Sequence, residues 1–375
     1  MKILFIDTYY ENFQNFFYKK NKSLKNYTYK VQLNSLLDES FGTSDSYSYY
    51  LNKEKILSKD ILVNCIHLQK MWAKENKINF SSFPLKIPHK FFKIPFIGKS
   101  FSNLNSLYDI AIAQIKNFQP DILYCQDLSF FSGNILKEIK EETNIKLLVG
   151  QIACPLPPES FLKPFDLILT SFPHFVEILN NKGIKSEYFK IGFDKRILSK
   201  IKNSERDINF SFVGGITKHH KSALETLNYL VLNQGLKIYG YGANKLPFNS
   251  PIRRNHFGEK WGLDMYKILS RTRISLNRHI DVSLNNANNM RLFEATGMGS
   301  LLLTDEKDNL NQLFEIDKEI VTYSCKEEAS EKVKYLLENP KKISEIALAG
   351  QKRTLKEHTY EIRMKELFGI LKQYI

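Results

Sequence analysis

The chain has 375 residues, of which 43% are hydrophobic and 25% charged. This length allows two packed domains, and the composition excludes a disordered or collagen-like chain. The 54 Lys and Arg residues exceed the 40 Asp and Glu residues, which gives a formal net charge of +14. A basic surface suits nucleic acid, anionic lipid or phosphorylated small molecules, or it reflects codon bias alone. The cations are dispersed, without an Arg-rich module, so we expect no nucleic-acid partner.

The four cysteines, Cys65, Cys125, Cys154 and Cys325, are far apart and include no Cys-x-x-Cys pair, so they predict no zinc site. No apolar run approaches the roughly 20 residues of a membrane helix. The apolar start of the chain is too short for a signal peptide. We therefore expect a cytoplasmic protein. Peripheral contact at the inner membrane face is the alternative use of the basic surface.

The first half of the chain predicts a doubly wound parallel sheet. Strands are expected over Lys2–Ile6, Ile61–Cys65, Asp121–Cys125, Lys146–Val149, Phe165–Thr170 and Ser186–Ile191. Amphipathic helices separate most of them, and such alternation is typical of a parallel sheet with helices on both faces. No GxGxxG follows any of these strands, so a nicotinamide fingerprint is absent. Ser82–Ser100, rich in Pro, Phe and Lys, is expected to be a long loop.

The second half of the chain predicts another sheet of the same kind. After a polar linker over Gly192–Asp207, strands are expected over Ile208–Val213, Lys237–Tyr239, Ile274–Leu276, Leu301–Leu303 and Glu319–Tyr323. Lys341–Ile375 reads as helices broken near His358, with Thr359 as the cap of the last one. We divide the chain into an N-terminal domain of residues 1–200 with the helix 360–375, and a C-terminal domain of residues 207–358.

The most informative stretch runs from Asn288 to Ser300 and continues into the apolar strand Leu301–Leu303. It predicts a short helix, a glycine-rich end and a buried strand. Arg291 and Glu294 are three residues apart and therefore share one helical face. The spacing leaves two interpretations open. Arg291 and Glu294 form a solvated ion pair, or they form one wall of a ligand site at the carboxyl ends of the strands.

The pattern Asn289-x-Arg291-x-Phe293-Glu294-Ala295, followed by Gly299 and the Leu-Leu-Leu-Thr strand, resembles the nucleotide-sugar site of GT-B glycosyltransferases. The similarity is to the CgeB-like branch of the group 1 proteins. It implies two Rossmann-like doubly wound domains facing a cleft, with a C-terminal helix that crosses back to the first domain. It also implies that Glu294 holds the ribose hydroxyls. Retaining members often carry a further glutamate where this chain has Asn286, which leaves the stereochemistry open.

Glycosyl transfer needs a grip on the nucleotide, cations for the diphosphate and a base for the acceptor hydroxyl. No Asp-x-Asp motif follows a strand, so we expect no metal and no cofactor. The resemblance and the strand ends give as candidates for nucleotide-sugar binding Gly214, Gly215, Lys218, His219, Tyr241, Arg278, His279, Asn289, Arg291, Glu294, Thr304 and Asp305. The open alternatives are a tight glycine turn, surface ion pairs and a packed tyrosine.

The catalytic base is expected in the first domain, where Asp127, His174 and Asp7 each follow a predicted strand. Asp127 is the first choice and His174 the second, although Asp127 and Asp7 could instead cap the next helix. We therefore predict a metal-independent hexosyltransferase that uses a nucleotide-sugar donor and an unidentified glycan, lipid or protein acceptor. The alternatives are a non-catalytic GT-B-like glycan- or nucleotide-binding protein and a GT-B nucleotide-sugar epimerase.

Overall fold

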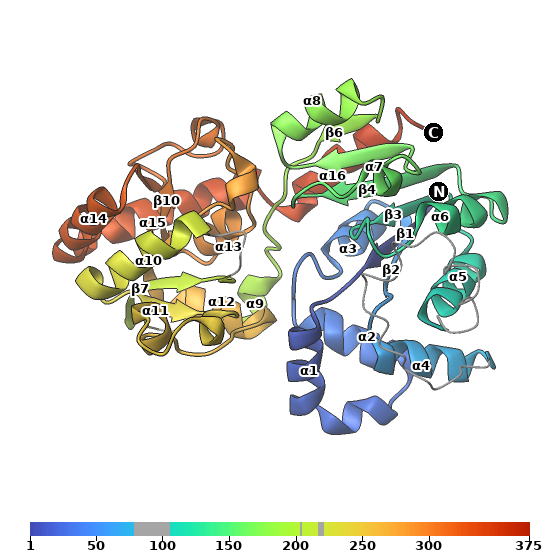
Figure 1. Ribbon diagram of the computed structural model, residues 1–375, viewed down its shortest axis with the longest axis horizontal. Coiled ribbons are helices and arrows are strands. Elements are labelled where there is room, and N and C mark those ends of the chain that lie inside the picture. Colours follow the sequence, from blue (N-terminus) through green and yellow to red (C-terminus); the bar gives the residue numbers. More distant parts are fainter. Residues whose placement is uncertain (79–105, 203–204, 217–220) are drawn as a thin grey trace.

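The computed structural model describes residues 1–78, 106–202, 205–216 and 221–375, which form two α/β domains side by side (Figure 1). All strand pairs within these residues are parallel. In this described part of the chain, the N-terminal sheet has six strands in the order β2-β1-β3-β4-β5-β6, and the C-terminal sheet has five in the order β11-β10-β9-β7-β8. The expected loop Ser82–Ser100 lies outside the described residues, as do the candidates Lys218 and His219.

The strands are β1 Lys2–Asp7, β2 Leu57–Leu62, β3 Ile122–Cys125, β4 Leu147–Ile152, β5 Leu167–Thr170, β6 Ser186–Tyr188, β7 Ile208–Val213, β8 Lys237–Tyr239, β9 Thr272–Asn277, β10 Leu301–Asp305 and β11 Val321–Tyr323. The first domain contains the helices α1 Glu11–Lys20, α2 Tyr29–Asp38, α3 Ser46–Lys53, α4 Ile66–Glu75, α5 Ser106–Phe118, α6 Gly133–Glu141, α7 Glu159–Leu162 and α8 Pro173–Asn181. The remaining helices are α9 Ile197–Lys200, α10 Lys221–Gln234, α11 Pro251–Arg254, α12 Gly262–Arg271, α13 Arg291–Gly297, α14 Lys326–Glu338, α15 Pro340–Glu357 and α16 Tyr360–Leu371.

Both sheets are covered on both faces, which explains their continuous apolar strands. Along β1, Leu4 and Ile6 belong to one core cluster, whereas Ile3 and Phe5 belong to another on the opposite face. The edge strand β2 differs from the prediction, because it begins at Leu57 rather than four residues later. An edge strand tolerates polar residues such as Lys59 and Asp60, and these hid its first half from the apolar pattern.

The last helix, α16, packs against the sheet of the first domain, so the expected crossing back is confirmed. Its apolar residues Tyr360, Met364, Leu367 and Leu371 share a core cluster with β1, β3, β4 and β5. Both chain termini therefore lie in the same domain (Figure 1). Thr359 stands at the N-cap position of α16, but its side chain makes no capping hydrogen bond, so that detail of the prediction is wrong.

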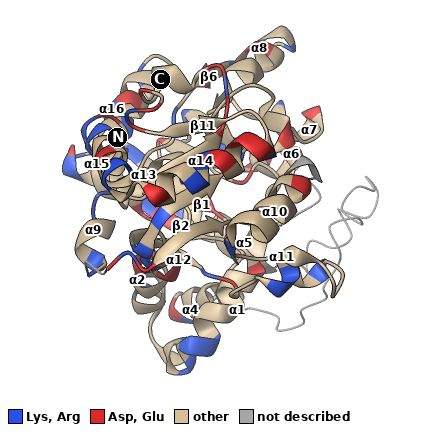
Figure 2. Cartoon of the chain, turned by 90° about the vertical axis from the view of Figure 1, so that its left-hand side faces the viewer, with Lys and Arg blue, Asp and Glu red and all other residues tan. Residues whose placement is uncertain are grey.

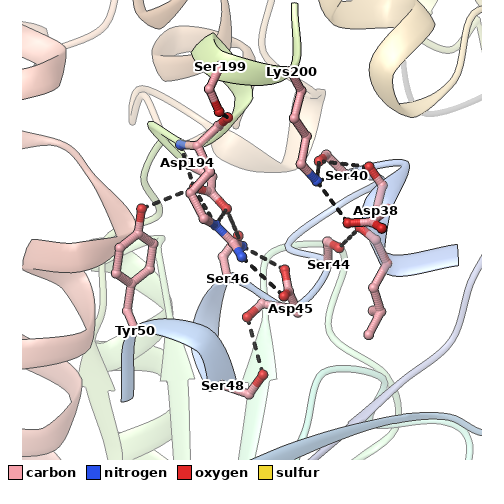
Figure 3. A network of polar contacts seen from close by, with 12 residues as sticks. Asp38, Ser40, Ser44, Asp45, Ser46, Ser48, Tyr50, Asp194, Ser199 and Lys200 are labelled. Carbon is pink, nitrogen blue, oxygen red and sulfur yellow. Dashed lines mark hydrogen bonds and ion pairs between the residues drawn. The ribbon is translucent and has the colours of Figure 1, made fainter. Parts of the chain in front are cut away.

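The chain passes between the domains twice, and the two crossings run side by side. The Phe193 amide donates to the His358 carbonyl oxygen at 2.8 Å, and the Tyr360 amide donates to the Phe193 carbonyl oxygen at 3.0 Å. Just beyond the first crossing, Asp194 accepts hydrogen bonds from Ser46 and Tyr50 of α3 (Figure 3). The first crossing is thus anchored to the N-terminal domain. No described helix has the length and apolar character to span a membrane.

Candidate active site

The carboxyl ends of the strands of the two sheets face each other, and contacts between the domains establish this. Tyr10, shortly after β1, packs against Tyr241, shortly after β8, with ring centroids 5.8 Å apart. Ser171, directly after β5, accepts a hydrogen bond from Asn288 Nδ2 at 3.2 Å. In strand order, β3 lies between β1 and β5, and β7 lies between β8 and β9. The tips of β3 and β7 therefore lie between these two contacts.

Each sheet has a topological switch point at which open α/β folds bind ligands. In the C-terminal sheet the order reverses between β7 and β9, so the crevice lies between Gly214–Gly215 and Arg278. In the N-terminal sheet it reverses between β1 and β3, so the crevice lies between Asp7 and Asp127. The fold thus puts candidates from both halves of the sequence at the two switch points.

Arg291 and Glu294 form a buried pair at the start of α13. Glu294 is only 5% exposed, and its Oε2 lies 2.9 Å from Arg291 Nη1. Its Oε1 accepts a hydrogen bond from Tyr266 Oη at 3.1 Å. Arg291 Nε donates to the carbonyl oxygen of Val213, at the end of β7, at 3.1 Å. The alternative of a solvated surface pair is therefore wrong, because the pair fastens α13 to the switch point.

Asn289 and Thr304 hold the strand tips in place. Asn289 Nδ2 donates to Asn277 Oδ1 at 2.8 Å and to the Arg278 carbonyl oxygen at 3.2 Å. Asn277 Nδ2 in turn donates to Thr304 Oγ1 at 3.0 Å. Thr304 was expected to face the sugar or phosphates, but its side chain is fully buried and turned to Asn277. Both residues therefore position the loop that carries Arg278.

Arg278 and Asp305 line a polar pocket of about 530 Å³ beside the tips of β9 and β10. Lys307 also lines it, with Nζ 3.4 Å from Asp305 Oδ2. The sequence pattern did not single out Lys307, although its place two residues after a strand end was a usable signal. Arg278 donates to Thr226 Oγ1 at 3.3 Å, while its buried Nε has no partner in the described part of the chain. The cations Arg278 and Lys307, which follow two neighbouring strands, therefore meet at this pocket, and the acidic residues Asp305, Glu306 and Asp308 also line it.

His279 and Asp305 form a hydrogen-bonded dyad. His279 Nδ1 lies 2.7 Å from Asp305 Oδ1, which also accepts the His279 amide at 3.1 Å. Burial raises the pKa of Asp305, but the hydrogen bond from His279 and the Lys307 charge outweigh it, so the pKa lies below its ordinary value. A carboxylate only accepts, so Nδ1 carries a proton. His279 Nε2 is buried and has no partner among the described residues.

The glycine pair after β7 packs against the turn after β8. The Gly214 amide donates to the Tyr239 carbonyl oxygen at 2.9 Å. A Cβ on Gly215 would lie 2.3 Å from Cζ of Tyr241. The Tyr241 ring also stacks on Trp261, with centroids 5.4 Å apart and an interplanar angle of 10°. Trp261 therefore covers one face of the Tyr241 ring, as the alternative of a packed tyrosine expects, and that face is closed to a nucleotide base.

Gly240 is the glycine that this packing constrains most. Its φ is +127°, and a Cβ would lie 2.0 Å from the Gly214 carbonyl oxygen. We predict that Gly240→Ala lowers the free energy of unfolding by about 3 kcal/mol through strain and displacement of the Gly214 turn. Gly235→Ala is the matched control, because its φ is +60° but nothing lies within 4 Å. It should cost only about 1 kcal/mol in chemical denaturation. Equal losses would contradict the role of the turn contact.

Asp7 and Asp127 are brought together at the N-terminal switch point through Thr8. Thr8 Oγ1 donates to Asp127 Oδ2 at 2.8 Å, and the Thr8 amide donates to Asp7 Oδ1 at 2.7 Å. Asp127 Oδ1 also accepts from the amide and hydroxyl of Ser129, so Asp127 caps the local turn. Burial raises the pKa of Asp7 to about 7. The hydrogen bond from the Thr8 amide lowers this pKa in part, and the nearby Asp127 charge raises it further. Asp7 therefore replaces Asp127 as the first candidate for the base.

His174 lies apart from the two aspartates, after β5, and contacts the other domain. Its Nδ1 is 3.1 Å from Asn286 Nδ2, the position at which related sites often carry a glutamate. The amide nitrogen donates, so Nδ1 accepts and a neutral ring carries its proton on Nε2. Burial lowers the pKa of His174, which keeps the ring neutral at pH 7. The three predicted bases thus do not form one cluster.

Comparison with known proteins agrees with this geometry. Residues 196–369 match the family of glycosyl transferase-like proteins. The whole chain superposes on 98% of a glycosyltransferase from Rickettsia africae, with a TM-score of 0.59 and 12% identity. It covers all of HepE from Anabaena, solved with UDP-glucose, at a TM-score of 0.61 and 11% identity. It also covers 98% of a sucrose-phosphate synthase from Thermosynechococcus elongatus, with a TM-score of 0.59 and 10% identity. The search of curated proteins gave no match.

The two facing parallel sheets and the returning helix define a GT-B protein, and the expected fold is confirmed. Residues 196–369, just under half of the chain, match the glycosyl transferase-like family, and the solved structures that cover the whole chain share its GT-B fold. The finer CgeB-like branch stays a prediction. Identities near 10% support the fold alone and say nothing about which donor or acceptor this chain uses.

Proposed function

We propose that the chain transfers a sugar from a nucleotide-sugar donor at the C-terminal switch point to a hydroxyl acceptor at the N-terminal switch point. The observation that carries this proposal is the buried Arg291–Glu294 pair fastened to the tip of β7. A buried ion pair contributes little net stability, because desolvation of the charges offsets their attraction. The position of this pair at a ligand crevice therefore favours a role in binding. HepE, of the same fold, was solved with UDP-glucose, which makes a uridine nucleotide the first donor to test.

On the donor side, each charged group has a distinct task. Tyr266 and Arg291 use two of the roughly four acceptor positions of the Glu294 carboxylate, which leaves others for the ribose hydroxyls. Arg278 and Lys307 offer cations at the pocket beside β9 and β10, where they would offset the charge that develops on the diphosphate. These side chains can act without a metal ion.

On the acceptor side, Asp7 would accept the proton of the attacking hydroxyl. The bond between the anomeric carbon and the diphosphate oxygen breaks, and the bond from the acceptor oxygen to that carbon forms. The nucleoside diphosphate leaves with the bonding electron pair. A carboxyl group whose pKa is about 7 suits this transfer, because it is partly ionised at neutral pH and still basic. Closure of the domains would bring acceptor and donor together.

The test is a thermal-shift panel with UDP, GDP, CDP and ADP on the wild type and Glu294→Ala. A nucleotide at about 100 times its Kd should stabilise the wild type by roughly 2.7 kcal/mol. We predict that Glu294→Ala loses this shift, because the ribose grip and the orientation of Arg291 are removed together. Glu357→Ala is the matched control, since it breaks another Arg–Glu pair, with Arg353, in the same domain. It should keep the shift.

The outcomes separate the alternatives. If no nucleotide shifts the wild type, the donor site is wrong and a glycan-binding protein becomes the better description. If a nucleotide binds, its sugar conjugates are incubated with the protein, and released nucleoside diphosphate is measured. Release with transfer of the sugar supports the transferase. A changed sugar configuration without a new glycoside would identify an epimerase, and binding without any turnover would identify a nucleotide-binding module.

A further inference from the structure

A basic and aromatic surface lies beside β8, the edge strand of the C-terminal sheet. The segment 237–258, from β8 through α11, contains the cations Lys237, Lys245, Arg253 and Arg254 and no acidic residue. Figure 2 shows the basic residues of α11 on the outside of this domain. In a chain that also carries 40 acidic residues, an acid-free stretch of this kind is a local positive field.

The same segment exposes its aromatic rings beside its cations. Phe248 is 83% exposed, and the Arg253 guanidinium carbon lies 3.7 Å from its ring centroid. Arg253 is held in turn, because its Nη1 donates to the Leu246 carbonyl oxygen at 2.7 Å. Phe257 is 48% exposed, with Lys237 Nζ 5.5 Å from its ring centroid. Single exposed apolar residues are ordinary, whereas these two exposed rings share one acid-free segment, and each lies beside a cation.

The edge of β8 is not available for an added strand from a protein partner. The Ile238 amide donates to the Asn255 carbonyl oxygen at 3.1 Å, and the Phe257 amide donates to the Ile238 carbonyl oxygen at 2.9 Å. Residues 255–257 therefore already cover this edge. Strand addition is the usual way in which a sheet edge binds a peptide, so this surface must use its side chains. Exposed rings among cations are the chemistry of an anionic bilayer surface.

We propose that the surface formed by Phe248, Phe257, Lys237, Lys245, Arg253 and Arg254 docks on anionic lipid membranes. Phe248 would enter the boundary between headgroups and acyl chains, while the cations contact lipid phosphates. This binding is independent of glycosyl transfer, and it orients the chain so that the far edge of the C-terminal sheet lies against the bilayer.

The test is co-sedimentation of the full chain with vesicles of phosphatidylcholine mixed with phosphatidylglycerol, and with vesicles of phosphatidylcholine alone. Wild type should bind only the anionic vesicles. Lys245→Gln combined with Arg254→Gln should weaken binding about thirtyfold, which corresponds to ~1 kcal/mol per cation. Phe248→Ala should weaken it about tenfold or more through the lost ring burial. All three side chains are exposed, so the thermal unfolding midpoint should not change.

The controls lie on α15, which packs against β10 rather than β8. Lys341→Gln combined with Lys352→Gln makes the same change in net charge, and Leu348→Ala removes another exposed apolar side chain. Both should bind the anionic vesicles as wild type does. Equal losses in the controls would overturn the proposal, as would unchanged binding of Phe248→Ala or no binding of wild type. Binding of a single-stranded oligonucleotide that fails in the same variants, without vesicle binding, would assign the surface to nucleic acid instead.

Discussion

Arg196→Met is expected to lower the free energy of unfolding by about 3–5 kcal/mol, as loss of one partner from a buried ion pair does. The Arg196 guanidinium bonds to both carboxylate oxygens of Asp45 and to Asp194, which is 6% exposed. It also stacks 3.8 Å from the Tyr49 ring centroid. Burial opposes ionisation of Asp194, yet Arg196 holds the pKa of that carboxyl below its ordinary value. Without Arg196 two carboxylates stay in place with no cation between them.

The control for this prediction is Arg271→Met, which removes an exposed pair with Asp207 and should cost at most ~1 kcal/mol. Both are measured by chemical denaturation at pH 7. Arg196 follows the first crossing between the domains, and it bonds to Asp194 and Asp45, which belong to the network that ties the crossing to α3. A second readout is therefore proteolysis of the crossing, which should quicken in Arg196→Met alone. A loss no larger than that of the control would mean that the network does not hold the crossing.

The fold was predictable from the sequence wherever the strands are apolar on both faces. Leu301–Leu303 and Ile208–Val213 read as buried strands and are strands, because both faces of the sheet are covered. The predicted start of the edge strand β2 was wrong, because polar residues interrupt its apolar pattern. The Thr359 cap failed because the backbone there follows the crossing at Phe193, a contact between residues far apart in sequence.

The candidate site was predictable to the extent that strand ends converge. The rule that parallel strands present their carboxyl ends together brought Arg278, His279 and Asp305 into one neighbourhood. It could not show that Glu294 is shared between Arg291 and Tyr266, because Tyr266 approaches from α12 through tertiary packing. The same holds for the contact from His174 to Asn286, which exists only because the domains meet.

Asp7→Asn is expected to lower kcat for nucleotide release from the donor sugar by about 10²–10⁴, the usual contribution of a general base. The donor KM should change little, since Asp7 lies on the acceptor side. The substitution keeps the shape of the side chain and the hydrogen bond from the Thr8 amide. The dependence of kcat/KM on pH shows which protonation state of Asp7 is active. The base works when ionised, so wild-type kcat/KM should rise as the pH passes through about 7, the pKa of Asp7. This rise on the acidic side of the profile, its acidic limb, should be absent in Asp7→Asn.

Two further variants make this prediction specific. Asp121→Asn changes an aspartate just before β3, at the opposite end of the same sheet, where it bonds to Lys146 and the Lys2 amide. It should leave kcat and the pH profile unchanged. Asp127→Asn should lower kcat less than Asp7→Asn, because the Asp127 oxygens already accept bonds from Thr8 and Ser129. If Asp127→Asn removes the acidic limb and Asp7→Asn keeps it, the proton goes to Asp127.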